Sequence, residues 1–223
     1  MDGDVDIAAV AGLLADPSRA AVLTALTDGR ALPPSELAEI AGVSRSTMSE
    51  HLAKLERAGL LAVERGGRNR YFRLSGPEVA AAIESLATLA PRRPVRSLRA
   101  SRRAGALGAA RTCYGHLAGR LGVALTEALA DRGAIEREED AFLLTEAGAE
   151  WMRGIGIEHP PRIGKPCNDW SERRPHLAGR LGVTLTSRLF DLAWLERTPA
   201  PRAVRLTPLG VEELRQRLGL ASP

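Results

Sequence analysis

Cysteine, aromatic residues and long apolar runs are all scarce in this sequence of 223 residues. It has only two cysteines, Cys113 and Cys167, which excludes a fold held together by several disulfides. No apolar run reaches the roughly 20 residues that a membrane-spanning helix needs, which argues against a membrane protein. The start, Met1–Asp4, lacks the basic and apolar segments of a secretory signal, so we expect a cytoplasmic protein.

Arginine carries most of the positive charge, and it is unevenly placed along the chain. Only two of the 31 basic residues, Lys54 and Lys165, are lysines, and the net charge is +4. Residues 92–103 include six arginines and no acid, and without these arginines the chain would be net negative. Such a segment indicates contact with nucleic acid or another acidic partner. We expect it in a linker, residues 91–106, between a first domain at 1–90 and a second at 107–223.

The pattern of residues 1–90 predicts three helices, a hairpin and a last helix. Asp16 and Pro17 begin a helix that ends near Gly29, Ser35 caps a short second helix, and Gly42 allows a tight turn. Ser44 caps a third helix, in which Met48, Leu52 and Leu55 recur on one face. The segments Leu60–Arg65 and Tyr71–Leu74 indicate strands around a tip at 66–69, and Pro77–Leu89 indicates the last helix.

This order of elements is typical of a winged helix-turn-helix, in which the third helix enters the major groove of DNA. Small polar groups opposite its apolar face suit close approach to base edges. The candidate DNA-binding residues are Ser44, Arg45, Ser46, Thr47, Ser49, His51 and Lys54 on this helix and Arg68, Asn69 and Arg70 at the wing. His51 borders the apolar face, so a structural role for it is an equal alternative.

Residues 10–75 resemble the ArsR/SmtB family of bacterial repressors. The segments that carry the resemblance are LLADPSRAAVLTAL (13–26) and ELAEIAGVSRSTMSEHLAKLERAGLLAVERGGRNRYFRLS (36–75). The resemblance implies a homodimer on double-stranded DNA, at an operator that is an imperfect inverted repeat. It places the first and last helices, about Val5–Leu14 and Pro77–Leu89, at the dimer interface, and it implies that a bound ligand releases the DNA.

The sequence departs from this family where its members usually bind metals. The position of the family's cysteine motif falls on Ala31–Leu37, which has no cysteine. The last helix offers Glu78 and Glu84 but no histidine. An effector would therefore bind elsewhere in this chain.

The second domain contains a duplication. Residues 116–137, HLAGRLGVALTEALADRGAIER, match residues 176–197, HLAGRLGVTLTSRLFDLAWLER, and the endings FLLTEAG (142–148) and VRLTPLG (204–210) follow. We expect two helix–wing–helix units packed on each other, with Gly119 and Gly179 inside helices for close packing. The predicted fold class is thus mainly α with small β-wings (α+β), a winged helix-turn-helix followed by this duplicated domain.

Both cysteines, all three tryptophans and three of the four histidines lie beyond residue 106. Cys113, His116, Cys167 and His176 would make a four-coordinate zinc site, with Cys113 and His116 on one helix face and Asp169, Glu172 or His159 as substitutes. Alternatively, Arg111 lowers the pKa of Cys113, which then forms a reversible disulfide with Cys167. In a third interpretation the histidines support their helices and the cysteines fill space. The cysteines do not align between the copies, which favours a function for the thiols.

Together these features predict a homodimeric transcriptional regulator, a repressor released by a small-molecule or metal effector or a thiol signal at the C-terminal domain. We do not expect an enzyme. One alternative is an enzyme with Cys113 and His116 as nucleophile and base, targeted by the winged helix. Another is a structural DNA-organising protein that binds without sequence preference.

Overall fold

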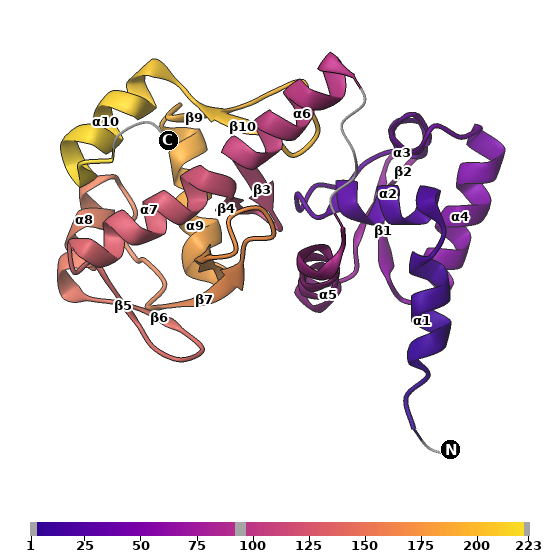
Figure 1. The fold of residues 1–223 in the computed structure, drawn as a ribbon, viewed down its shortest axis with the longest axis horizontal. Coiled ribbons are helices and arrows are strands. Elements are labelled where there is room, and N and C mark those ends of the chain that lie inside the picture. The colour runs from indigo at the N-terminus through magenta and orange to yellow at the C-terminus, as the bar shows by residue number, and fades with distance from the viewer. Residues whose placement is uncertain (1–3, 92–96, 221–223) are drawn as a thin grey trace. The chain divides into compact units, whose positions relative to one another are not determined.

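The computed structural model describes residues 4–91 and 97–220 (Figure 1). The chain forms two compact units, residues 1–83 and 84–223. Their boundary falls within the helix Pro77–Leu89, rather than after it as the sequence division at residue 90 implies. The predicted linker 91–106 is helical from Leu98 onward, because Ser97 caps a helix there by accepting a hydrogen bond from the Ala100 amide. Residues 92–96 of the arginine-rich segment lie outside the described residues.

The predicted order of elements in the first part of the chain is confirmed. The elements are α1 (Ile7–Leu14), α2 (Pro17–Leu26), α3 (Pro34–Ala41), α4 (Arg45–Arg57), β1 (Leu61–Gly66), β2 (Asn69–Leu74) and α5 (Pro77–Leu89). Asp16 caps α2 by accepting from the Ser18 and Arg19 amides, and Ser44 caps α4 by accepting from the Thr47 amide. These caps satisfy amides that have no partner inside the helix, which fixes where each helix begins.

Two details of the first unit differ from the sequence prediction. Ser35 is not a cap: it lies inside α3, whose N-cap is Pro33. A proline at the first helical position loses no hydrogen bond there, so α3 begins two residues earlier, at Pro34. The hairpin tip is Gly67-Arg68 rather than residues 66–69, since Gly66 and Asn69 still pair across β1 and β2. Gly67 adopts a φ of +63°, which suits a two-residue turn.

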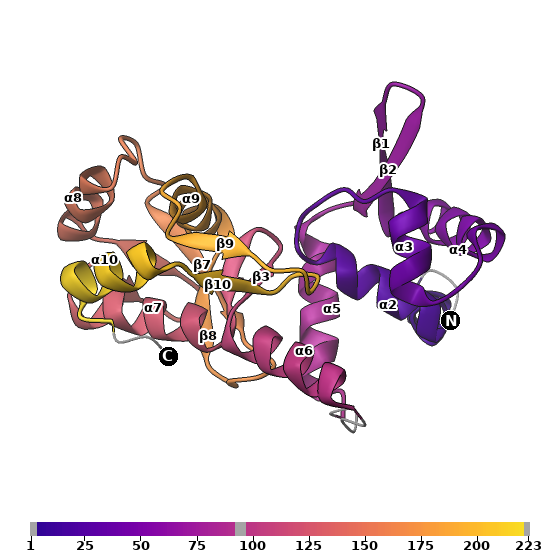
Figure 2. The same cartoon turned by 90° about the horizontal axis from the view of Figure 1, so that it is seen from above.

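The core of the first unit lies between α2, α3, α4 and the base of the hairpin. Its most buried apolar side chains include Val22, Leu23, Leu26, Leu37, Met48, Leu52, Leu55, Phe72 and Leu74. Leu32 adds a third short strand segment, because its backbone exchanges two hydrogen bonds with Phe72. The hairpin β1–β2 projects from the helices of this unit (Figure 2). Because α4 packs into this core through one face only, its opposite face is exposed.

The second unit contains the predicted duplication, with one more hairpin in each copy than the sequence indicates. After α6 (Leu98–Ala109), the first copy has β3 (Arg111–Cys113), β4 (His116–Ala118), α7 (Gly119–Asp131), β5 (Ile135–Arg137), β6 (Phe142–Leu144) and α8 (Glu146–Gly154). The second has β7 (Ile163–Asn168), β8 (Pro175–Ala178), α9 (Gly179–Asp191), β9 (Leu195–Arg197), β10 (Val204–Leu206) and α10 (Pro208–Leu218). Each copy is thus hairpin, helix, hairpin, helix.

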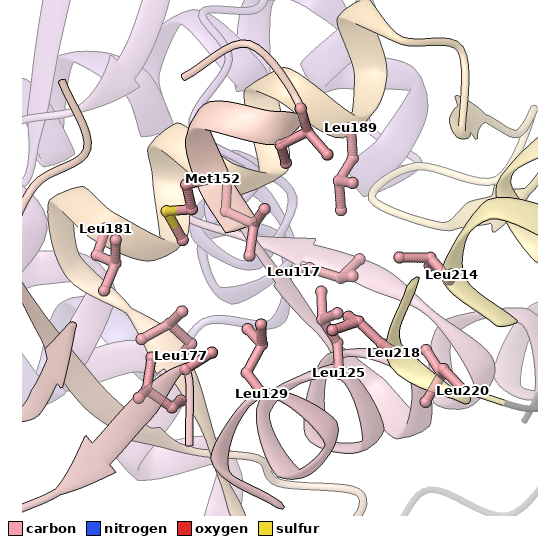
Figure 3. Close-up of a cluster of buried hydrophobic side chains, with 14 of the residues drawn as sticks. Leu117, Leu125, Leu129, Met152, Leu177, Leu181, Leu189, Leu214, Leu218 and Leu220 are labelled. Carbon is pink, nitrogen blue, oxygen red and sulfur yellow. The ribbon is translucent and has the colours of Figure 1, made fainter. Parts of the chain in front are cut away.

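The two copies pack on each other reciprocally. Strand β6 of the first copy pairs with β7 of the second, and Arg111 of the first bridges to Ala203 of the second. Helix α7 packs on β8, and α9 packs on β4. One apolar core runs through both copies, and leucines of α7, α9 and α10 contribute to it together with Met152 of α8 (Figure 3). The duplication therefore forms a single folded body rather than two separate wings.

The glycines that begin α7 and α9 have a different role from the predicted one. The sequence places Gly119 and Gly179 inside helices that start near His116 and His176, but those segments are strands β4 and β8. Gly119 and Gly179 have φ of +79° and +69°, a conformation that L side chains rarely adopt. They turn the chain from strand into helix. The two histidines are therefore strand residues just ahead of that turn.

Within the described residues no single helix is long and apolar enough to span a membrane. The pair α1 and α2 meets that test only together, with a bend of 92° between them.

Candidate functional site

The exposed face of α4 carries the side chains expected to read DNA. Met48, Leu52 and Leu55 are buried, whereas Arg45, Ser46, Thr47, Ser49 and Lys54 are exposed. The Ser44 hydroxyl lies 2.9 Å from both the Ser46 and the Thr47 hydroxyl oxygens. A compact group of hydroxyls at a helix N-terminus can approach base edges or phosphates closely.

The wing offers two exposed polar side chains and one that is already paired. Arg68 and Asn69 are exposed at the tip of the hairpin. Arg70 instead forms an ion pair with Glu56 of α4, with 2.9 Å between Nη2 and Oε2, and its guanidinium lies over the Phe72 ring. Arg70 thus links the wing to α4, and because this ion pair is exposed, Arg70 stays a candidate for contact with the DNA backbone beside Arg68 and Asn69.

His51 does not share the exposed face with the other α4 candidates. Its side chain is 13% exposed, and its Nε2 lies 4.0 Å from a carboxylate oxygen of Asp16, the residue that caps α2. The structural alternative therefore describes this side chain better than a contact with phosphate.

In the second unit, the structure brings all four predicted metal or thiol residues into one cluster. Their ligand atoms, the two cysteine Sγ atoms and one ring nitrogen of each histidine, all lie within 4.8 Å of one another. The two histidine Nε2 atoms face each other at 3.0 Å. His176, Cys113 and His116 are 0%, 2% and 6% exposed, and Cys167 is half-buried. We refer to Cys113, His116, Cys167 and His176 as the Cys2His2 cluster.

Two hairpins deliver these side chains in the same way. Cys113 lies opposite His116 across β3 and β4, and Cys167 lies opposite His176 across β7 and β8. Directly opposed residues of an antiparallel pair project from the same face. The first hairpin closes through Tyr114 and Gly115, both at positive φ, as a two-residue turn requires. Cys113 and His116 thus meet across a hairpin, and the prediction that they share a helix face is wrong.

Known proteins match both the first unit and nearly the whole chain. Residues 14–64 match the family described as helix-turn-helix domain. An HTH-type transcriptional regulator of Bacillus subtilis, YdfF, is 41% identical over 211 residues, which cover 92% of this chain and 93% of that protein. The chain belongs to the ArsR/SmtB-type winged helix-turn-helix transcriptional regulators. It is a DNA-binding regulator of transcription.

Two further similarities involve a smaller part of this regulator. The HTH-type regulator CmtR of Mycobacterium tuberculosis is 38% identical over 73 residues, 33% of this chain and 61% of that protein. The solution structure of the cadmium metal-sensor CMTR from the same organism is 32% identical, and the match covers 42% of this chain and all of that one with a TM-score of 0.33.

Asp169 lies next to the regulator's Cys2His2 cluster, beside the His176 ring. Its carboxylate accepts hydrogen bonds from Arg111 Nη2 at 3.0 Å, the Gly119 amide at 2.7 Å and the Ser171 hydroxyl at 2.6 Å. It also lies 3.4 Å from Nδ1 of His176. Burial would raise the pKa of Asp169, but the His176 ring beside it and the Arg111 charge outweigh burial and hold that pKa well below its usual value. Asp169 is therefore a charged carboxylate that orients the His176 ring.

The environment of the two thiols differs from the one that the disulfide interpretation assumes. Arg111 is fully buried against Asp169 and the Trp170 ring. The pKa of Cys113 is raised to about 12, first by a hydrogen bond with Cys167 and then by burial. The same hydrogen bond lowers the pKa of Cys167. The pKa of Cys113 is thus raised rather than lowered, contrary to the prediction that Arg111 activates this thiol.

The two cysteines are equivalent in the fold, contrary to the sequence comparison. Alignment without gaps pairs Cys113 with Arg173 and Cys167 with Leu107, because the hairpin of the second copy is longer. Each cysteine nevertheless lies opposite the histidine of its own hairpin. Of the suggested substitutes, His159 is exposed and Glu172 is half-buried, and neither belongs to the group that could hold a metal.

Sequence reasoning missed Arg202 altogether. Its Nε donates to the Thr112 carbonyl at 3.2 Å, and its Nη2 lies 2.5 Å from a carboxylate oxygen of Glu84 on α5. Both side chains of this ion pair are less than 10% exposed. Burial would raise the pKa of Glu84, yet the Arg202 and Arg111 charges lower it. The only signal in the sequence is that the mainly apolar helix α5 carries Glu84 in its middle, and this does not indicate which residue pairs with it.

Proposed function

We propose that this regulator is a homodimeric repressor that binds an inverted-repeat operator and releases it when the C-terminal unit receives a signal. The observation that carries the DNA-reading part is the exposed N-terminal face of α4, with Ser46 and Thr47 beside the cap. In winged and related helix-turn-helix proteins, this part of the recognition helix contacts base edges. Arg45, Lys54, Arg68 and Asn69 are suited to position the helix through phosphate contacts.

Exposed apolar side chains on α1 and α5 support the homodimer. No residue of α1 is buried: Ile7 and Val10 are 73% and 42% exposed, and Val5, just ahead of the helix, is 76% exposed. On α5, Leu86 and Leu89 are 48% and 81% exposed. Large apolar side chains gathered on exposed helices indicate an interface with another chain. A second copy of this chain fits, because two recognition helices about 34 Å apart read successive major grooves on one face of DNA.

The Cys2His2 cluster supports the C-terminal unit as the place where the signal is received. It joins one hairpin from each copy of the duplication, and it contains both cysteines of the chain. A catalytic role for Cys113 is not part of this proposal, since a buried thiol whose pKa is raised to about 12 is a poor nucleophile.

The first prediction tests the reading face of α4. Replacing Ser46 and Thr47 together by alanine should weaken binding to a labelled fragment from the gene's own upstream region by at least about tenfold, since a good base contact contributes about 1–3 kcal/mol. Fluorescence anisotropy measures this affinity. Ser187→Ala, which removes an exposed serine of α9, is the matched control and should bind normally. Unchanged affinity in the double variant would remove α4 as the reading helix.

A further inference from the structure

The Cys2His2 cluster has the composition and dimensions of a metal site. Among residues 4–91 and 97–220, these four side chains form the one group of histidine, cysteine and acidic residues that could hold a metal ion. We propose that they bind one zinc ion through the two thiolates and the Nε2 atoms of both histidines. This deepens the proposed function by naming the ligand of the C-terminal unit, and its regulatory consequence rests on that function.

The spacing of the donor atoms fits a tetrahedral ion. With Zn–S of about 2.3 Å and Zn–N of about 2.0–2.1 Å, ligand atoms around tetrahedral zinc lie about 3.3–3.8 Å apart. All four donor atoms of the cluster already lie within 4.8 Å of one another, and the two Nε2 atoms lie 3.0 Å apart. Binding therefore needs only small shifts of side chains that are already on the same faces of their hairpins.

The donor set selects zinc over the common hard cations. Two sulfur and two nitrogen donors suit Zn²⁺, whereas Mg²⁺ and Ca²⁺ prefer oxygen ligands. The charge also balances, because two thiolates neutralise a divalent ion. The charged groups around the cluster are paired with each other, Arg111 with Asp169 and Arg202 with Glu84. A bound zinc ion would therefore leave no net charge in this buried position.

Asp169 supplies the outer support that zinc-binding histidines usually have. Its carboxylate lies 3.4 Å from Nδ1 of His176, which leaves Nε2 of that ring directed at the cluster. Such a carboxylate fixes the tautomer and the orientation of a ligating histidine. Asp169 is itself fixed by Arg111, Ser171 and the Gly119 amide.

A disulfide between Cys113 and Cys167 is the main alternative to metal binding by these two cysteines. It would explain the two thiols but not the two buried imidazoles whose Nε2 atoms face each other. Four donors that converge from two hairpins are instead what a tetrahedral ion requires. The geometry therefore favours the metal over the disulfide.

The ion would join the two copies of the duplication and act on α5. Each copy gives one cysteine and one histidine, so the ion crosslinks the β3–β4 and β7–β8 hairpins. Thr112, next to Cys113, accepts from Arg202 through its carbonyl, and Arg202 pairs with Glu84 of α5. A shift of β3 on zinc binding would therefore be transmitted to the helix that we assign to the dimer interface.

The test measures zinc binding by the reduced full-length chain after treatment with a chelator. Competition against a chromophoric zinc indicator should give one zinc per chain. Cobalt(II) in place of zinc should show the intense visible bands of a tetrahedral ion and a sulfur-to-cobalt charge-transfer band. Cys113→Ser, Cys167→Ser and His116→Ala should each weaken zinc binding by more than the roughly 10–100-fold that loss of an outer partner costs.

His159→Ala is the matched control, since it removes an exposed histidine of the same unit and should keep the wild-type affinity and spectrum. Near-ultraviolet circular dichroism separates loss of ligands from loss of the fold, and His116→Ala provides a variant that keeps both thiols. The proposal is overturned if the reduced chain binds no zinc, or if wild-type affinity survives in the cysteine variants. It also fails if cobalt shows no thiolate band.

DNA binding, measured separately by anisotropy, distinguishes this inference from the proposed function. Zinc that binds stoichiometrically and lowers operator affinity supports both. Zinc that binds without any change in operator affinity leaves the metal site standing and removes its role as the signal. Absence of any specific DNA binding would contradict the proposed function, whatever the zinc titration shows.

Discussion

Glu84 and Arg202 form a buried ion pair between residues 118 positions apart in the chain. Removing one partner leaves the other charge buried without compensation, which typically costs about 3–5 kcal/mol. A similar pair close by, Arg205 with Glu196, is largely exposed, and exposed pairs contribute about 1 kcal/mol or less. The two ion pairs therefore contribute very differently to the stability of the second unit.

We predict that Glu84→Gln destabilises the second unit by about 3–5 kcal/mol, whereas Glu196→Gln changes its stability by no more than about 1 kcal/mol. All three tryptophans, Trp151, Trp170 and Trp194, belong to this unit, so their fluorescence during denaturant unfolding reports on it alone. Equal stability of the two variants would show that Glu84 and Arg202 are not paired as described.

Two glycines, one in α7 and one in α9, allow the two copies of the duplication to approach each other closely. A Cβ atom at Gly182 of α9 would collide with the Leu177 carbonyl and lie 3.3 Å from Cβ of His116 in the other copy. Gly122 of α7 has the reciprocal surroundings, with the Leu117 carbonyl and His176. These glycines let each histidine pack against the helix of the opposite copy. Gly105 of α6, by contrast, has open space around it.

Gly182→Ala should therefore destabilise the second unit by about 1–3 kcal/mol through overpacking. Gly105→Ala should stabilise it by up to about 1 kcal/mol, since alanine is the better helix former. Denaturant unfolding followed by tryptophan fluorescence compares the two variants. Equal changes in unfolding free energy for the two variants would show that Gly182 is no more tightly packed than Gly105.

The sequence predicts best those elements whose bounds are set by residues close to one another along the chain. Asp16 and Ser44 act as caps, and the spacing of Met48, Leu52 and Leu55 marks the buried face of α4. Strands of three residues, such as β3 and β4, are too short to show an alternating pattern, so the sequence predicts a helix around Cys113 and His116 instead. The four residues of the Cys2His2 cluster are predictable by type, but their cross-strand pairing depends on that missed hairpin. Arg202 and Glu84 meet only through the tertiary fold.

The proposed homodimer depends on apolar side chains that the single chain leaves exposed. Leu86 on α5 is 48% exposed and Leu209 on α10 is 50% exposed, yet only α5 corresponds to a dimer helix of the family. We predict that Leu86→Glu shifts the protein to monomer, whereas Leu209→Glu leaves it dimeric. Sedimentation velocity at several concentrations measures this. A wild-type chain that is monomeric throughout would contradict the dimer.

In the proposed regulator, the state of the Cys2His2 cluster sets how tightly α4 holds DNA. The most direct measurement is the anisotropy of a labelled upstream fragment titrated with the reduced regulator, first free of metal and then loaded with zinc, beside His116→Ala. Coupling between sites typically changes affinity by about 5–150-fold. We predict a zinc-dependent loss of affinity in this range for the wild type and none for His116→Ala. Superimposable wild-type curves with and without zinc would contradict the account.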